Sequence, residues 1–110
     1  MLRDFFLGSI KIHILYHADI EPIYGAFLMK ELASHGYNIS PGTLYPTLKS
    51  LHSNGLLHKY EETVNGKIRK YYTITEHGKK VLEEGKQQVR ELAQEILYDQ
   101  GYGKGGIKDE

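Results

Sequence analysis

Hydrophobic residues near the start of the chain recur at the spacing of an amphipathic helix. The side chains of Leu2, Phe6, Ile10 and Ile14 are each four residues apart and therefore share one helix face. The pattern predicts a first helix that runs to about His17, where the segment ADIEP interrupts it.

A second helix is predicted to end at Gly36. Ile23 and Tyr24 are compatible with a very short strand, and Phe27 and Leu28 begin the next helical stripe. Glycine is the residue that most readily adopts the left-handed conformation at a helix C-terminus, so Gly36 is the expected stop.

The third predicted helix spans about Pro41 to Asn54. Ser40 is a typical N-cap, and proline is tolerated at the first helical position, where its missing N–H has no helical partner in any case. Leucines recur on one face at Leu44, Leu48 and Leu51. The same helix therefore combines an apolar back with a polar, hydroxyl-rich start.

The period changes from helical to alternating after this helix. Residues Leu57 to Val64 alternate, Asn65-Gly66 is the strongest short-range signal for a β-hairpin turn, and Lys67 to Thr75 alternate again. A two-stranded hairpin is weak alone, so it is expected to pack against the helices.

A long last helix is predicted to begin at Glu76, with Thr75 as its N-cap. Its stripe has alternating spacings of four and three residues, at Gly78, Leu82, Gly85, Val89, Leu92 and Ile96. Each glycine weakens a helix by about 1 kcal/mol. Either the close approach of a neighbouring segment or a bend would account for the two glycines.

The order of these elements predicts a mainly α fold with a small β-hairpin, of the winged helix-turn-helix type. Residues 1–75 form the expected DNA-binding domain, and residues 76–100 form a dimerisation helix continuous with it. Residues 101–110 contain four glycines and are expected to be a disordered tail.

Charge and composition limit the function classes. Basic and acidic residues number 14 each, but residues 40–75 carry five basic and two acidic side chains, a local excess of three positive charges. The chain has no cysteine, which excludes disulfides, thiolate zinc sites and cysteine nucleophiles. With no signal-peptide pattern and no apolar run of about 20 residues, a soluble cytoplasmic protein without membrane contact is expected.

The third helix and the hairpin are the candidate binding surfaces for double-stranded DNA. In a helix-turn-helix the N-terminal residues of the recognition helix lie nearest the bases, and basic side chains on the hairpin can neutralise phosphates. The candidate DNA-binding residues are Ser40, Thr43, Tyr45, Thr47, Lys49, Asn65, Gly66, Lys67, Arg69 and Lys70. Alternatively, Tyr45 covers the edge of the core, and the hairpin cations only protect an exposed strand edge.

Self-association is expected because the last helix has more apolar surface than so small a core can bury. The candidate dimer residues are Phe5, Phe6, Ile10, Leu82, Val89, Leu92, Ala93 and Ile96. The first helix of one subunit and the last helix of its partner could leave a cavity for a small apolar or aromatic effector, or could pack together without one. A two-fold dimer would read an inverted repeat.

Enzymatic and metal-binding functions find little support. The chain has no glycine-rich phosphate loop and no nucleophile or zinc-protease motif, so no enzyme activity and no cofactor are predicted. His13 and His17 are four residues apart, but without cysteines or a carboxylate at ligand spacing no metal site is predicted. The serious rival is a winged-helix adaptor that binds proteins rather than DNA.

Three segments resemble the PadR family of bacterial transcriptional regulators. They are PIYGAFLMKEL, ISPGTLYPTLKSLHSNGLL and GKIRKYYTITEHGKKVL, within a resemblance that extends over about Leu2 to Ile96. It implies a homodimeric DNA-binding repressor, usually of a nearby operon, that a small effector releases. The short chain is similar to the smaller subgroup, whose effectors vary.

Positions matching the family pattern suggest roles for individual residues. The resemblance places Ser40, Thr43, Tyr45 and Lys49 at DNA, and Gly66, Lys67 and Arg69 in the wing. It also implies that Leu82, Val89, Leu92 and Ile96 join the subunits.

Overall fold

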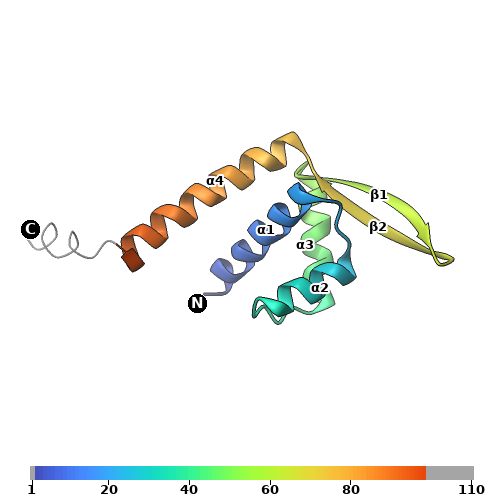
Figure 1. The fold of residues 1–110 in the computed structure, drawn as a ribbon, viewed down its shortest axis with the longest axis horizontal. Coiled ribbons are helices and arrows are strands. Elements are labelled where there is room, and N and C mark those ends of the chain that lie inside the picture. The colour runs from blue at the N-terminus through green and yellow to red at the C-terminus, as the bar shows by residue number, and fades with distance from the viewer. Residues whose placement is uncertain (1, 99–110) are drawn as a thin grey trace, which may run out of the picture.

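The computed structural model describes residues 2–98, which form four α-helices and one antiparallel hairpin (Figure 1). The elements are α1 (Arg3–Ile20), α2 (Gly25–Ser34), α3 (Pro41–Ser53), β1 (Leu57–Val64), β2 (Lys67–Ile74) and α4 (Glu76–Ala93), and a π-helical turn (Gln94–Tyr98) continues α4. The predicted winged helix-turn-helix with a long last helix is therefore confirmed. The predicted tail at residues 101–110 lies outside the described residues.

The first helix is longer than the apolar stripe predicts. It continues past His17 to Ile20 because Ala18 is also buried in the core. Glu21 is the C-cap residue that follows the helix, and its backbone is extended. Glu21 precedes Pro22, and the proline ring disfavours helical conformation in the residue before it.

The core forms where α1, α2, α3 and the base of the hairpin meet. The leucine face of α3 is buried as predicted, with Leu44 and Leu48 fully inaccessible and Leu51 only 3% exposed. Ile10 and Ile14 of α1 reach the same cluster. Burying side chains of this size contributes about 1.5–3 kcal/mol each, so this cluster sets the orientation of α3.

The hairpin forms around the predicted Asn65-Gly66 turn. Leu57 lies opposite Ile74 and Val64 opposite Lys67, and both turn residues have positive φ, +52° at Asn65 and +79° at Gly66. Two consecutive positive φ values are typical of the type I′ turn, whose twist matches that of the strands.

A short backbone bridge attaches the hairpin to the helices. Ile23 and Tyr72 exchange two hydrogen bonds, with N···O distances of 2.9 and 2.8 Å. The very short strand considered at Ile23 and Tyr24 is thus a single bridging residue. It joins the linker between α1 and α2 to the free edge of β2.

The start of α4 is held by a threonine cap, as predicted. The Thr75 hydroxyl accepts a hydrogen bond from the Gly78 N–H at 2.8 Å and donates one to the Gly55 carbonyl at 2.6 Å. This side chain therefore connects α4 to the turn that follows α3.

Replacing Thr75 with alanine is expected to lower the free energy of unfolding by about 1–2 kcal/mol. Loss of an N-cap side chain typically costs about 1 kcal/mol, and the hydrogen bond to Gly55 is lost with it. Urea unfolding followed by circular dichroism, at one fixed protein concentration, measures the effect. Thr63→Ala, at an exposed position of β1, is the control and should change stability by less than about 0.5 kcal/mol. Equal stabilities of the two variants would contradict the capping role.

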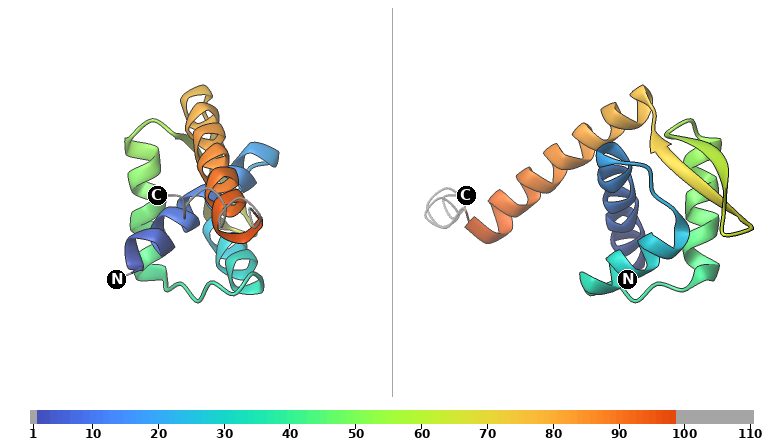
Figure 2. Two further views of the ribbon diagram at one scale, coloured as in Figure 1. Left: turned by 90° about the vertical axis from the view of Figure 1, so that its left-hand side faces the viewer. Right: turned by 45° about the vertical axis from the view of Figure 1, so that its right-hand side comes forward.

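Beyond its first turns, α4 leaves the body of the molecule. Figure 2 shows it crossing α1 and extending away from α3 and the hairpin, which lie together at the other end. At the crossing, a Cβ on Gly85 would lie 3.2 Å from the Ile12 side chain, so the glycine allows the two helices to approach closely. No helix within residues 2–98 has the length and apolar character needed to cross a bilayer.

Candidate nucleic-acid interface

The exposed face of α3 carries the polar residues that the sequence predicts at DNA. Ser40, Tyr45 and Lys49 are exposed, and Thr43 and Thr47 are partly exposed. Lys49 is the only lysine or arginine of the helix. Because the leucine face is buried, this polar face must point outward.

The start of α3 has no side-chain cap. Ser40 has the extended backbone of an N-cap residue, but its hydroxyl donates to the Thr43 hydroxyl at 3.4 Å instead of accepting from a backbone N–H. The capping bond expected of Ser40 is therefore absent. Pro41 has no N–H, and the Thr43 and Leu44 amides donate to the Ser40 carbonyl at 3.0 and 2.9 Å. The Gly42 N–H is therefore the amide of this first turn left for an anion such as a phosphate.

Thr47 is the least available of the predicted α3 contacts. Its hydroxyl donates a hydrogen bond of 2.7 Å to the Thr43 carbonyl one turn earlier. Threonine inside a helix commonly makes this backbone bond. The oxygen can still accept a hydrogen bond, but its proton is engaged within the helix.

Tyr45 is exposed on α3 and also packs at the edge of the core. Its side chain is 50% exposed on α3. It also packs over Gly25 at the start of α2, where an added Cβ would lie 2.6 Å from the Tyr45 ring. The hydroxyl end of the Tyr45 ring thus covers Gly25 at the edge of the core, while half of the residue's surface remains exposed.

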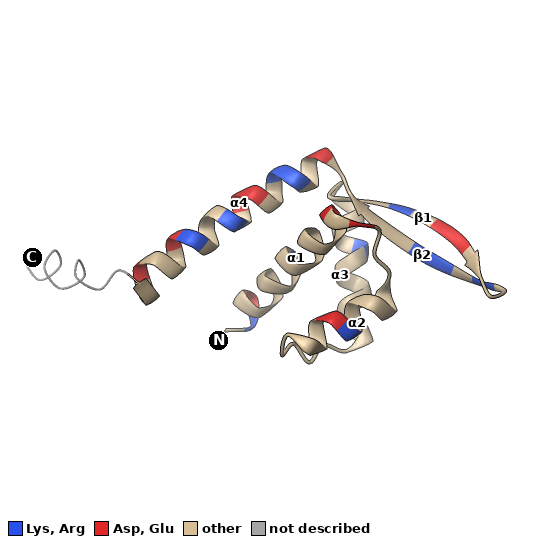
Figure 3. Cartoon of the chain, viewed as in Figure 1, with Lys and Arg blue, Asp and Glu red and all other residues tan. Residues whose placement is uncertain are grey.

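The hairpin is less positive than its sequence suggests. In the strand register Glu61 lies opposite Lys70, and Glu62 lies opposite Arg69. Opposite charges in these cross-strand positions attract and partly compensate each other. Lys67 lies opposite Val64 instead, next to the turn, so it is the cation best placed at the tip (Figure 3).

Arg69 lies against an aromatic surface that the sequence analysis did not identify. Its guanidinium carbon is 4.0 Å from the centre of the Tyr24 ring. The Tyr71 side chain, as a hydrogen-bond partner, raises the pKa of Arg69, and burial acts in the opposite direction. Arg69 is partly buried, whereas Lys67 and Lys70 are exposed. The period-two pattern places Arg69 and Tyr71 on one strand face, but only the fold brings Tyr24 to them.

A model of the transcriptional regulator PadR-like family matches residues 14–84, which is more than half of the chain. The chain belongs to the PadR-like family. It is 41% identical over 104 residues to the transcriptional regulator Rv3488 of Mycobacterium tuberculosis, covering 94% of this chain and 97% of that protein. It is 34% identical over 97 residues to the transcriptional regulator YqjI of Escherichia coli, covering 86% of this chain but only 45% of YqjI. Both relatives are transcriptional regulators rather than enzymes.

Solved structures agree with this family assignment. A PadR family transcriptional regulator from Eggerthella lenta superposes with a TM-score of 0.76 and 36% identity, covering 87% of this chain and 85% of that one. The protein smu.1704 from Streptococcus mutans superposes with a TM-score of 0.77 and 29% identity, covering 92% of each chain. This protein is a PadR-family transcriptional regulator with the winged-helix fold.

The residues predicted at a dimer interface of this PadR-family regulator divide into exposed, intermediate and buried groups. Phe5, Val89, Leu92 and Ile96 are exposed by 62, 52, 44 and 64%. Leu2 and Leu97, which the sequence analysis did not select, are also exposed, by 72 and 57%. Leu2 and Phe5 lie at the start of α1, Val89 and Leu92 lie on α4, and Ile96 and Leu97 lie on the π-helical turn that follows it. Apolar side chains therefore remain uncovered at all three places.

Ile10 and Leu82 are corrections to the predicted interface. Ile10 is 0% exposed and Leu82 is 1% exposed within one subunit, where both belong to the core. A side chain that is already buried has no surface left for a partner. Phe6 and Ala93 are intermediate, since Phe6 packs on Tyr37 with ring centres 5.6 Å apart.

A groove of about 740 Å³ lies between α1 and α4 of this PadR-family regulator. Among the predicted cavity residues, Phe5, Val89 and Leu92 line it, whereas Phe6, Ile10 and Ala93 do not. Polar groups also line it, at Ser9, His13 and Tyr16. An apolar groove with a few polar groups is typical of small-molecule sites.

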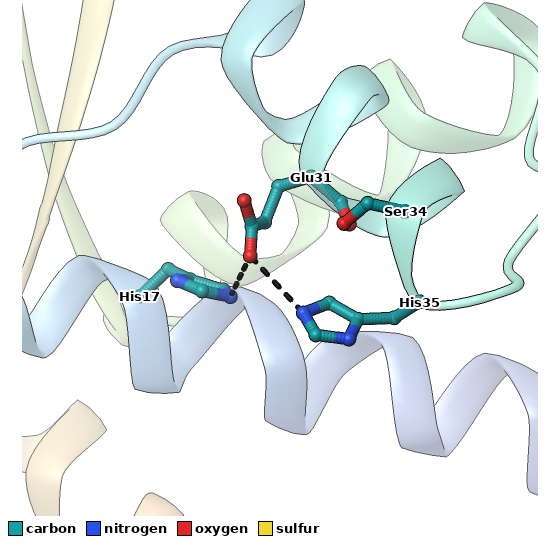
Figure 4. A network of polar contacts seen from close by, with 4 residues as sticks. All are labelled: His17, Glu31, Ser34 and His35. Atoms are coloured by element: carbon teal, nitrogen blue, oxygen red, sulfur yellow. Dashed lines mark hydrogen bonds and ion pairs between the residues drawn. The ribbon is translucent and has the colours of Figure 1, made fainter.

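Glu31 of α2 connects this helix to α1 (Figure 4). Its Oε2 is 3.7 Å from Nε2 of His17 on α1 and 3.1 Å from Nε2 of His35 at the end of α2. Its backbone carbonyl accepts a 2.7 Å hydrogen bond from Ser34. Sequence spacing predicts the contact with His35 at i+4, but the contact with His17 depends on how α1 and α2 pack.

His13 lies beside this network. Its ring stacks on His17 and His35, with ring centres 6.3 and 5.7 Å apart. Burial lowers the pKa of His13, and His35 and His17 lower it further, while Glu31 acts in the opposite direction. Within residues 2–98, no group of three or more His, Cys, Asp or Glu side chains has an arrangement that could hold a metal ion. The three histidine rings pack against one another between α1 and the end of α2.

Proposed function

We propose that this PadR-family regulator is a homodimeric repressor that binds an inverted-repeat operator in double-stranded DNA. The observation that carries the proposal is the orientation of α3, whose three leucines are buried while its uncapped, hydroxyl-rich start is exposed. The hairpin lies at the same end of the molecule. A recognition helix in the major groove with a wing on the adjacent backbone fits this arrangement.

The candidate DNA-binding residues other than Arg69 have the following proposed roles. Ser40, Thr43 and Tyr45 approach bases and phosphates from the start of α3, with Thr47 one turn behind them. Lys49, together with Lys67 and Lys70 of the hairpin, neutralises phosphates. Asn65 and Gly66 form the tight turn that lets the hairpin tip come close to the DNA backbone.

Dimerisation supplies the two-fold symmetry. The exposed apolar surface of α4 and the start of α1 forms the proposed interface between subunits. It lies at the end of the molecule away from α3 and the hairpin, so pairing leaves both DNA surfaces free. We also propose that a small apolar or aromatic effector enters the groove between α1 and α4 and releases the repressor.

DNA binding is testable through its salt dependence. Fluorescence anisotropy with the duplex upstream of the protein's own gene should show affinity that falls linearly on a log–log plot against salt, with a slope near −0.9 per phosphate contact. Lys67→Ala removes one contact per subunit, so the slope of the dimer should become less steep by about 1.8. A scrambled duplex should bind more weakly than the operator.

Lys80→Ala is the control for this experiment, since Lys80 is an exposed lysine on α4. Its slope should match that of the parent protein. Failure of the parent to bind any duplex at low salt would contradict the proposed function and favour a protein–protein adaptor. An unchanged slope for Lys67→Ala would instead contradict only the role of the hairpin tip.

A further inference from the structure

Arg69 differs from the other cations of the hairpin. Lys67 and Lys70 are exposed, while Arg69 is partly buried with its guanidinium over the Tyr24 ring at 4.0 Å. This distance is well inside the range of about 6 Å over which a cation is attracted to an aromatic face. No carboxylate of the described residues lies within ion-pair distance of Arg69, so its partners there are the Tyr24 ring and the Tyr71 side chain.

Two further tyrosines support this contact. Tyr71 meets the Tyr24 ring edge to face, with ring centres 5.6 Å apart, and stacks on Tyr60 at 5.3 Å with an angle of 17° between the rings. Tyr60 and Tyr71 are directly opposite each other in the strand register. We name Tyr24, Tyr60, Arg69 and Tyr71 the wing clamp.

The wing clamp joins the hairpin to the start of α2. Tyr24 is the N-cap residue of α2, which precedes the recognition helix, whereas the other three residues lie on the hairpin. The neighbouring bridge between Ile23 and Tyr72 holds the base of β2 by its backbone. Arg69 is only two residues from Lys67, so the clamp carries this support toward the tip.

We propose that Arg69 is a positioning residue, whose contact with Tyr24 sets the angle of the hairpin so that Lys67 meets a DNA phosphate. This inference rests on the proposed DNA-binding function. It replaces the expectation that Arg69 itself neutralises a phosphate. A hairpin tip held at one angle reaches DNA without first losing conformational freedom, so the clamp raises affinity by pre-organisation.

Two measurements separate positioning from phosphate contact. The first is the log–log salt slope of DNA binding. Arg69→Ala should weaken operator binding about three- to tenfold at every salt concentration and leave the slope unchanged. If Arg69 contacts a phosphate in each subunit, the slope becomes less steep by about 1.8, and the proposal is wrong.

The second measurement is the backbone order of the hairpin tip in the DNA-free protein, from ¹⁵N relaxation of the Gly66 and Lys67 amides. Arg69→Ala should lower the order parameters of both amides from values of about 0.85. Lys70→Ala removes a positive charge from the opposite face of the same strand and should leave the tip ordered. For Arg69→Ala, unchanged order parameters would overturn the proposal whether or not the protein binds DNA.

A double-mutant cycle identifies Tyr24 as the partner. Tyr24→Leu should weaken operator binding about as much as Arg69→Ala, and combining the two should add little further loss. Tyr24→Phe keeps the ring face and should retain the parent affinity. Additive losses in the double variant would contradict the clamp. Circular dichroism of each variant verifies that the helices are intact.

Discussion

Leu92→Asp is expected to convert the proposed dimer into monomers and to lower operator affinity about 100-fold or more. Leu92 lies between Val89 and Ile96 on the exposed stripe of α4. Pairing two copies along this stripe would bury the new carboxylates against apolar side chains, which is strongly unfavourable. A monomer then loses the second half-site contact, and with it the gain in affinity that two linked contacts supply.

Sedimentation velocity at micromolar concentration measures the oligomeric state, and fluorescence anisotropy measures operator binding. Gln87→Asp is the matched control, because it adds the same charge at an exposed position on the opposite side of α4. It should remain a dimer and bind DNA like the parent. A stable dimer of Leu92→Asp would show that this stripe is not the interface.

Gly78→Ala is expected to destabilise the protein by about 2–3 kcal/mol. A Cβ at Gly78 would run into the carbonyl oxygen of Leu56 and would lie 2.7 Å from the Ile74 side chain. Backbone atoms cannot rotate away as a side chain can, so α4 would have to shift from the end of the hairpin. The gain in helix propensity, about 1 kcal/mol, offsets only part of this strain.

The midpoint of urea unfolding measures this loss. Gly8→Ala in α1 is the control, because no heavy atom lies within 4 Å of an added Cβ there. It should keep or raise stability, by up to about 1 kcal/mol. If the two alanine variants have equal midpoints, the contact at Gly78 is not tight.

The roles of Gly78 and Gly85 depend on segments that are distant in the sequence. Their spacing on the last helix left two explanations open, close approach and a bend. Close approach accounts for both, since Gly78 faces the Leu56 carbonyl and Gly85 faces Ile12. Leu56 lies in the connection between α3 and the hairpin, and Ile12 lies on α1. No residue pattern within α4 identifies either neighbour.

The candidate DNA surface was largely predictable because its signals are local. The leucine spacing of α3 determines which face is buried, and the polar start of the helix is outward as a consequence. The availability of individual groups was not predictable. The hydroxyl of Thr47 bonds to its own helix, and Arg69 lies on Tyr24.

The sequence by itself determined the elements of this protein and their faces. Helical and alternating periods, the Asn65-Gly66 turn and the Thr75 cap all act between residues close in the chain, so their outcome is independent of distant neighbours. Only the tertiary structure decided what covers each face. Ile10 and Leu82 were expected between subunits but are core residues, because α1, α2, α3 and α4 pack around them. Periodicity tells which residues share a face, whereas burial and partner choice depend on the segments that fold against it.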